Sequence, residues 1–198
     1  MASKLAIENP LAAEDCPESL MPLDEFIGNL SKHAKESGKA QFQEIVKALL
    51  DFRLRVPPIY NLDPRFIIVD TMNCQVKVLL TPALFERKRD IQGLTKDDLR
   101  YITPEELYGH GRSITSPFWV LGCMLYEAQF VKNPFHTVMK PKVTEELIKK
   151  YPVIFPKEAE GQELLQDLII NLLIKDPLQR LGSDKMEEEI LEHAYFAQ

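Results

Sequence analysis

Apolar residues recur at helical spacing in the segment 40–55, which reads AQFQEIVKALLDFRLR. The recurring positions are Phe42, Ile45, Val46, Leu49 and Leu50. Residues three and four apart lie on one face of a helix, and this face continues for more than two turns. Because Pro57 and Pro58 follow, the helix should end before them.

Other segments predict helices by their capping residues or their apolar content. Thr103-Pro104-Glu105-Glu106 combines a hydroxyl cap, a proline suited to the first helical position and acidic groups in the first turn. The stretch 118–126 is almost wholly apolar and should form a helix buried on all sides. Further helices are expected from near Leu23, across 145–150, along 164–173 and from about Asp184. We also expect a helical turn capped at Thr95 and a polar connection over 31–39.

Two short apolar runs predict a β-hairpin. They are FIIVD, from Phe66 to Asp70, and QVKVLL, from Gln75 to Leu80, and the four residues between them suit a turn. A short strand is also expected over residues 4–8, before Pro10 breaks it. The sequence has no repeat and no low-complexity tract, so we predict one mostly helical domain with a small hairpin.

Composition and charge narrow the class of protein. The 198 residues fit one domain, and 45% hydrophobic with 27% charged residues is ordinary for a folded chain. The net charge of -6 argues against general nucleic-acid binding, which usually shows a basic stripe. The N-terminal residues resemble neither a signal peptide nor a transit peptide, and no run approaches the ~18–20 apolar residues that cross a bilayer. We therefore expect a soluble, cytoplasmic protein. The initial methionine and the end of the chain soon after Phe196 lead us to expect a complete gene product.

The cysteines and histidines give no sign of a metal site. Cys16, Cys74 and Cys123 lie far apart, and no CxxC or Cys/His cluster occurs. Neither a disulfide framework nor zinc is therefore expected. His110 and His193 lack a nearby set of ligands, so packing or loop roles are expected for both.

Three blocks of sequence resemble landmarks in the C-terminal lobe of a protein kinase. YITPEEL (Tyr101 to Leu107) resembles the tyrosine-x-alanine-proline-glutamate segment of that family, and FWVLGCMLYE followed by NPF (Asn133 to Phe135) resembles its central buried helix. LLIKDPLQRLG (Leu172 to Gly182), followed by EHAYF (Glu192 to Phe196), is similar to the end of the domain. The RLG and the histidine-x-x-phenylalanine spacing point to the cyclic-nucleotide-dependent, AGC-like serine/threonine kinases.

The resemblance, which covers roughly Leu5 to Phe196, implies a fold and one buried contact. It implies a mainly α, kinase-like C-lobe with a small β-hairpin and no N-lobe, with residues 1–22 as a residual strand, hinge and loop and residues 23–198 as the C-lobe domain. It also implies that Glu105 pairs with Arg180. A planar guanidinium can bond a carboxylate at two points, which favours arginine in a partly buried pair.

The same resemblance implies that the groups needed for phosphoryl transfer are missing. Such transfer needs Mg²⁺ ligands, a lysine on the phosphates and a carboxylate base. No GxGxxG pattern occurs, and aligning Tyr60 and Pro64 with the family's catalytic loop leaves the loop one residue short. In this alignment the catalytic aspartate is replaced by Asn61 or falls in the gap, Asp63 takes the place of the loop lysine, and Phe66 takes that of the metal-binding asparagine. Leu80, Thr81 and Pro82 stand at the DFG motif, so all six residues occupy degenerate catalytic positions. Pro117 stands near the position of an aspartate that normally braces the catalytic loop. We therefore expect a pseudokinase that is not an enzyme and holds no cofactor and no metal.

A lone lobe of this kind would expose the face that an N-lobe normally covers. That face would be edged by residues 5–7 and 66–80, and exposed apolar surface and strand edges usually mark interfaces. We expect a structural subunit or scaffold that binds protein partners through this face, in the cytoplasm within a cytoskeletal or ciliary assembly, with no nucleic-acid or membrane partner. Two alternatives stay open: an active or nucleotide-binding kinase fragment completed by another chain, and a decoy that competes for the partners of a true kinase.

Two short motifs allow a functional and a structural interpretation. Pro57-Pro58-Ile59-Tyr60 matches the PPxY ligand of WW domains, although Tyr60 packed inside the fold is the favoured reading. Thr95 lies where an activation segment carries a phosphorylation site, and phosphorylation there would change a binding surface.

Overall fold

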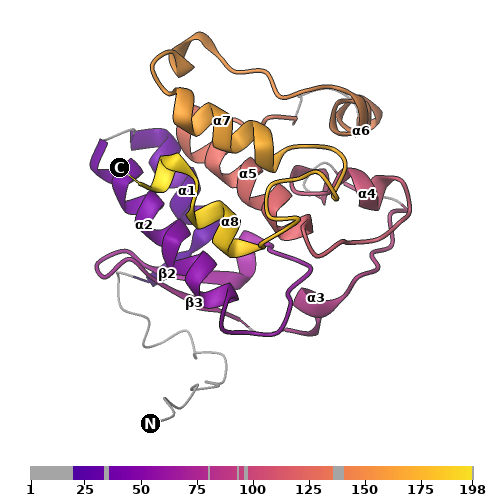
Figure 1. Ribbon diagram of the computed structural model, residues 1–198, viewed down its shortest axis with the longest axis horizontal. Helices are drawn as coiled ribbons and strands as arrows, with labels where there is room; N and C mark the ends of the chain where they lie inside the picture. Colours follow the sequence, from indigo (N-terminus) through magenta and orange to yellow (C-terminus); the bar gives the residue numbers. More distant parts are fainter. Residues whose placement is uncertain are drawn as a thin grey trace.

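The computed structural model describes residues 20–33, 36–79, 81–92, 94–95, 98–135 and 141–197. Its helices gather around a central helix, α5, with a small sheet against one side (Figure 1). This confirms the prediction of a mainly α fold with a small β-hairpin. The elements are β1 (Leu20–Pro22), α1 (Leu23–His33), α2 (Glu36–Arg53), β2 (Ile67–Asp70), β3 (Gln75–Val78), α3 (Pro82–Phe85), α4 (Pro104–Leu107), α5 (Ser116–Phe130), α6 (Pro141–Lys150), α7 (Glu163–Leu172) and α8 (Glu187–Leu191), with short 3₁₀ turns at Pro64–Phe66, Asp98–Arg100, Lys157–Ala159 and Ala194–Phe196.

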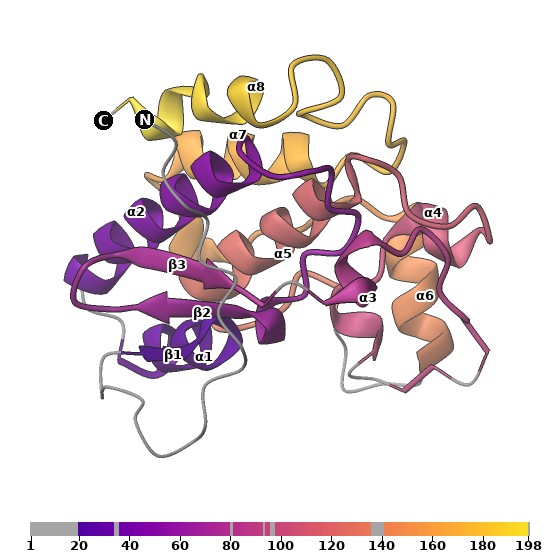
Figure 2. The same cartoon turned by 90° about the horizontal axis from the view of Figure 1, so that it is seen from below.

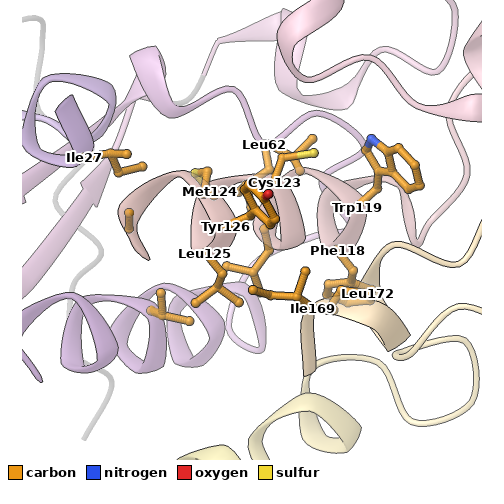
Figure 3. Close-up of a cluster of buried hydrophobic side chains, with 14 of the residues drawn as sticks. Ile27, Leu62, Phe118, Trp119, Cys123, Met124, Leu125, Tyr126, Ile169 and Leu172 are labelled. Atoms are coloured by element: carbon orange, nitrogen blue, oxygen red, sulfur yellow. The ribbon is translucent and has the colours of Figure 1, made fainter. Parts of the chain in front are cut away.

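Helix α5 is buried along nearly its whole length, as its apolar sequence predicts. Every residue from Ser116 to Ala128 is buried. Figure 3 shows Phe118 pointing toward Ile169 and Leu172, whereas Trp119 leaves the helix on another side. A helix that is apolar all round needs neighbours on every side, and α1, α2 and α7 supply them.

The predicted stripe of α2 lies in the core, but its predicted start was wrong. Its five apolar positions are all buried. The polar connection expected over 31–39 is mostly helix, because α1 continues to His33 and α2 begins at Glu36. Lysine, alanine and glutamate favour the helical backbone even where no apolar residue is present. The low hydrophobicity of residues 31–39 was therefore not enough to indicate a loop.

The sheet has three antiparallel strands in the order β1-β2-β3. The hairpin of β2 and β3 confirms the sequence prediction, whereas β1 was not predicted, because three residues ending in a proline are too short to show alternation. Met21, Val69 and Val76 are paired across the strands, and these residues and their neighbours on the same face pack on the core. The strand expected over residues 4–8 lies outside the described residues.

Helix ends follow the predicted chemistry at α4 but not at α8. At α4, Thr103 and Glu106 form the reciprocal capping box. Helix α8 begins at Glu187 rather than near Asp184, because the carboxylate of Glu189 accepts from the amides of Gly182, Asp184 and Lys185 and holds them in a turn. The amide of Asp98 donates to the hydroxyl of Thr95 and the amide of Thr95 to the Asp98 carboxylate, as the predicted capping box requires, and Asp98 begins the 3₁₀ segment Asp98–Arg100. Within the described ranges, no helix combines the length and apolar character needed to cross a membrane.

Candidate functional site

Glu105 and Arg180 meet in the interior between α4 and the segment that follows α7. Arg180 Nη1 donates to Glu105 Oε1 and Arg180 Nη2 to Glu105 Oε2, each at 2.9 Å. The side chain of Arg180 is 0% exposed and that of Glu105 is 4% exposed. The structure thus places the pair that the resemblance implied in a two-point, buried geometry.

Further hydrogen bonds engage donors of Arg180 and the carboxylate of Glu105 beyond the ion pair itself. Arg180 also donates to the carbonyl oxygens of Ile174 and Thr115, and Glu105 accepts from the hydroxyl of Ser116 at 2.7 Å. Burial raises the pKa of the Glu105 carboxyl, but the hydrogen bonds and charge of Arg180 outweigh this and hold the pKa below its ordinary value. The network fixes α4 to the start of α5 and to the turn after α7.

Three other arginine–glutamate pairs were missed by sequence reasoning. Arg112 donates to Glu106 at 2.9 Å and Arg53 to Glu187 at 2.6 Å, and both pairs are buried. Glu127, on α5, accepts from Arg100 and from the hydroxyl of Tyr101. Arg53 and Glu187 are 134 positions apart in the sequence, so no local spacing signals their contact.

Burial shifts the pKa of Arg53 and of Tyr101, and in each case the neighbouring glutamate also acts on the pKa. Burial lowers the pKa of Arg53, although Glu187 opposes the shift. Burial and the adjacent charge of Glu127 raise the pKa of Tyr101 well above its ordinary value. The Tyr101 phenol therefore stays protonated and acts as a donor to Glu127.

Of the residues that the resemblance aligns with catalytic positions, the described Asn61, Asp63 and Phe66 line one hollow. The amide of Asn61 donates to the carbonyl of Leu84, and its side chain to that of Ala83, which joins this loop to α3. Asp63 caps the 3₁₀ turn at Pro64, and its carboxylate accepts from the backbone and guanidinium of Arg65. The Asp63 carboxylate is thus already engaged.

The remaining positions of this set have structural roles. Phe66 is half-buried, and its carbonyl accepts from the amide of Leu79 at 2.8 Å. Thr81 precedes α3, whose first residue is Pro82, and its buried hydroxyl meets no hydrogen-bond partner among the described residues. Leu80 lies outside the described residues. Tyr60 is half-buried rather than fully packed inside the fold, and the guanidinium of Arg87 lies 5.2 Å from its ring centre.

A hollow of about 280 Å³ lies beside these residues. Its lining carries both signs of charge, with Asp63, Glu86 and Asp90 against Arg65, Lys88, Arg89 and Arg112. Within the described part of the chain, no group of three or more His, Cys, Asp or Glu side chains is placed to hold a metal ion. Charges of both signs suit polar contacts with a protein surface as well as a small ligand.

Thr95, Asp98 and Arg89 form a small network at the edge of this hollow. The carboxylate of Asp98 accepts from the amide and hydroxyl of Thr95 and from Arg89 at 2.6 Å. The hydrogen bonds from Thr95 lower the pKa of Asp98. The hydroxyl of Thr95 is therefore held by a carboxylate at the surface.

Comparisons with known proteins identify what the chain is related to. No protein-family model matches it. It is 38% identical over 102 residues to "Protein kinase PINOID 2" of Arabidopsis thaliana, which covers 48% of this chain and 19% of that protein. It is 33% identical over 96 residues to "Serine/threonine-protein kinase WAG1" of Arabidopsis thaliana, and 34% identical over 98 residues to "Serine/threonine-protein kinase YPK1" of Saccharomyces cerevisiae, covering 48% and 50% of this chain and 20% and 14% of those proteins.

These relatives are AGC-family serine/threonine kinases. About half of the chain is homologous to them, which confirms the resemblance to a kinase C-lobe of the AGC-like group. The chain spans at most about a fifth of the length of each of these three relatives. The prediction that the chain is not an enzyme is contradicted, because the relatives are named as protein kinases and this points toward an enzyme.

Proposed function

We propose that this kinase-related chain acts by protein–protein contact, as a subunit or scaffold docked through the exposed side of its three-stranded sheet. The observation that carries the proposal is the composition of that side. The pairing of Pro22 with Ile68 and of Ile68 with Lys77 places these residues on the face opposite Met21, Val69 and Val76. We call Leu20, Pro22, Ile68, Asp70, Gln75 and Lys77 the outer sheet face.

The outer sheet face has an apolar half and a polar half. Leu20, Pro22 and Ile68 are half-buried, whereas Gln75 and Lys77 on β3 are exposed. Beside the face, Met72 in the hairpin turn is 81% exposed, and Leu79 after β3 is exposed as well. Protein interfaces commonly join an apolar area to a polar rim, and Gln75 and Lys77 would form one side of such a rim.

Strand β3 adds a second means of docking. It lies at the edge of the sheet with α2 packed nearby, and no described strand pairs with its outer side. An unpaired edge offers backbone donors and acceptors to a strand from another chain. A partner that adds a strand at β3 would contact Met72 and Leu79 at the same time.

The test compares charge substitutions at this face with one elsewhere. Tagged chain recovered from its native extract is expected to bring down a small set of proteins at constant ratio. Met72→Glu and Leu79→Glu should remove these proteins, because a charge would enter an apolar contact. Ile154→Glu is the matched control, since Ile154 is 77% exposed in the loop between α6 and α7. A monodisperse monomer that captures nothing would overturn the proposal.

The second candidate is an active or nucleotide-binding kinase fragment completed by another chain, and the kinase names of the relatives favour it. Such a protein must bind nucleotide, so millimolar ATP with Mg²⁺ should raise its melting temperature by mass action. No shift would count against this candidate. A decoy would instead form a weak, exchangeable complex with the partners of a kinase. The cytoplasmic location, in a cytoskeletal or ciliary assembly, stays a prediction, which fractionation of the recovered complex would test.

A further inference from the structure

A hollow of about 520 Å³ lies beside α4 and α6, remote from the sheet. Figure 1 and Figure 2 both show α4 and α6 next to each other at one end of the molecule, with the strands toward the other end. We call it the α4–α6 hollow. Its lining includes Tyr108, His110, Lys149, Lys175, Asp176 and Pro177. Its volume lies in the range of about 300–1,000 Å³ that is typical of binding sites.

Close contacts fix the walls of the α4–α6 hollow. Tyr108 has the ring of His110 at 6.3 Å and the amine of Lys149 at 5.2 Å from its own ring centre. Gly111 has a φ of +75°, and a Cβ there would lie 2.6 Å from the carbonyl oxygen of Arg87, so the loop can approach Arg87 only with glycine. On the other side, the hydroxyl of Thr115 donates to the carbonyl of Pro177 at 2.9 Å.

The charges that the α4–α6 hollow presents are mainly positive. The carboxylate of Glu105, which also lines it, is paired with Arg180, and the guanidinium of Arg112 is paired with Glu106. Lys149 and Arg87 have no carboxylate partner among the described ion pairs, and the acidic residue Asp176 in the lining accepts from the amide of Leu178. A positive hollow on a chain of net charge -6 is a local feature that selects anionic partners.

Lys175 also contributes to the lining of the hollow, but its amine is buried. Its Nζ is buried 4.0 Å from the ring centre of Phe135 and 4.8 Å from that of Trp119, and it has no hydrogen-bond acceptor among the described residues. The rings satisfy part of its charge through their π faces. Because the Nζ of Lys175 is buried beside these rings, the accessible positive charges of the hollow are those of Lys149 and Arg87.

Apolar surface adjoins these charges. Tyr108, which lines the hollow, is exposed, and Pro177 lines it too. Ile114 and Leu178, which follow the lining residues Ser113 and Pro177 in the sequence, are also exposed. Exposed apolar residues next to the amine of Lys149 and the guanidinium of Arg87 suit a chain that carries both carboxylates and a large apolar side chain. A small anion would use only the charges and would leave the apolar rim in water.

We propose that the α4–α6 hollow is a docking site for an acidic peptide segment of a partner protein. A large apolar side chain of the segment packs against Tyr108 and Pro177, and its carboxylates lie near Lys149. The site is separate from the outer sheet face, so it goes beyond the proposed function and can fail or hold independently of it.

The test begins with selection from a random twelve-residue peptide library displayed on phage, using the full chain as bait. The enriched peptides are expected to be acidic and to carry an aromatic residue or leucine. Fluorescence anisotropy of a labelled enriched peptide then gives its Kd. Raising the salt concentration from 50 to 500 mM should weaken binding, because contacts between charges near the surface are screened.

Two neighbouring lysines on α6 give matched variants. Lys149→Glu should weaken peptide binding about tenfold, because it reverses a charge at the hollow. Lys150→Glu should change the Kd less than twofold, because Lys150 is exposed, pairs with Glu146 and does not line the hollow. Met72→Glu should bind the peptide normally, which separates this site from the sheet. Enrichment of neutral or basic peptides, no enrichment, or equal losses in the two lysine variants would overturn the proposal.

Discussion

Arg180 donates two hydrogen bonds of 2.9 Å to the carboxylate of Glu105, which lies 75 positions away in the sequence, and both side chains are buried. The contact joins α4, the start of α5 and the turn after α7. These are three of the segments that carry the kinase resemblance. Its energetic weight comes from burial, since losing one partner would leave the other charge in the interior without compensation.

Replacing Arg180 by leucine should lower the free energy of unfolding by about 3–5 kcal/mol, because the Glu105 carboxylate would stay buried without its partner. Urea unfolding monitored by circular dichroism measures the change. Arg55→Leu is the control, since Arg55 is exposed and pairs with Asp51 one helical turn away. That change should cost less than about 1 kcal/mol. If both variants lost the same free energy of unfolding, the buried pair would contribute no more to stability than the exposed one.

The Arg53–Glu187 pair should couple α2 to α8. A double-mutant cycle with Arg53→Met and Glu187→Gln isolates the interaction from each residue's other contacts. We expect a coupling free energy above about 1.5 kcal/mol, because both side chains are buried at a contact of 2.6 Å. The exposed Lys150–Glu146 pair should give about 0.3–0.5 kcal/mol in the same assay. Additive effects at Arg53 and Glu187 would contradict the prediction.

Gly122 should be intolerant of alanine, although it lies inside a helix. A Cβ at Gly122 would lie 2.9 Å from the Leu173 side chain and 3.0 Å from that of Leu172, so α5 and the end of α7 would have to separate. We expect Gly122→Ala to lower the melting temperature, with a cost of about 1–3 kcal/mol.

Gly28 in α1 is the matched control for Gly122. Among the described residues, no atom of a neighbouring segment would lie within 4 Å of a Cβ there, so Gly28→Ala should be neutral or stabilise the fold by up to about 1 kcal/mol. Thermal unfolding of both variants decides the comparison. A stable Gly122→Ala together with an unstable Gly28→Ala would refute the packing argument.

Lys175 should make stability depend on pH in the alkaline range. Burial lowers the pKa of its amine from 10.5 to about 8. Between these values the unfolded chain binds the proton and the folded chain does not, so this group makes stability rise with pH from about 8 to 10.5. At pH 7 the charged amine destabilises the fold, and Lys175→Met should therefore raise the free energy of unfolding by about 1 kcal/mol.

The advantage of Lys175→Met over the natural chain should shrink as the pH rises to 10.5. Urea unfolding of both proteins at pH 7, 9 and 10.5 measures it. A variant that is less stable than the natural chain, by the same amount at every pH, would mean that the contacts of the amine with Trp119 and Phe135 outweigh its desolvation.

Local patterns in the sequence were enough to predict much of the fold. The stripe of α2, the capping box at Thr103, the buried α5 and the hairpin of β2 and β3 each depend on residues a few positions apart. Hydrophobic spacing and cap chemistry act over such distances, so they can be read in one dimension. The relation to AGC kinases also rests on short blocks in a fixed order.

Tertiary structure decided what depends on residues far apart in the chain. Strand β1 forms because β2 offers it an edge, and Arg53 becomes a buried partner because α8 packs against α2. The α4–α6 hollow exists because Tyr108, Lys149 and Pro177 come from three separate segments. None of these has a local signature, since the free energy that selects them comes from burial and pairing across the fold rather than from neighbouring residues.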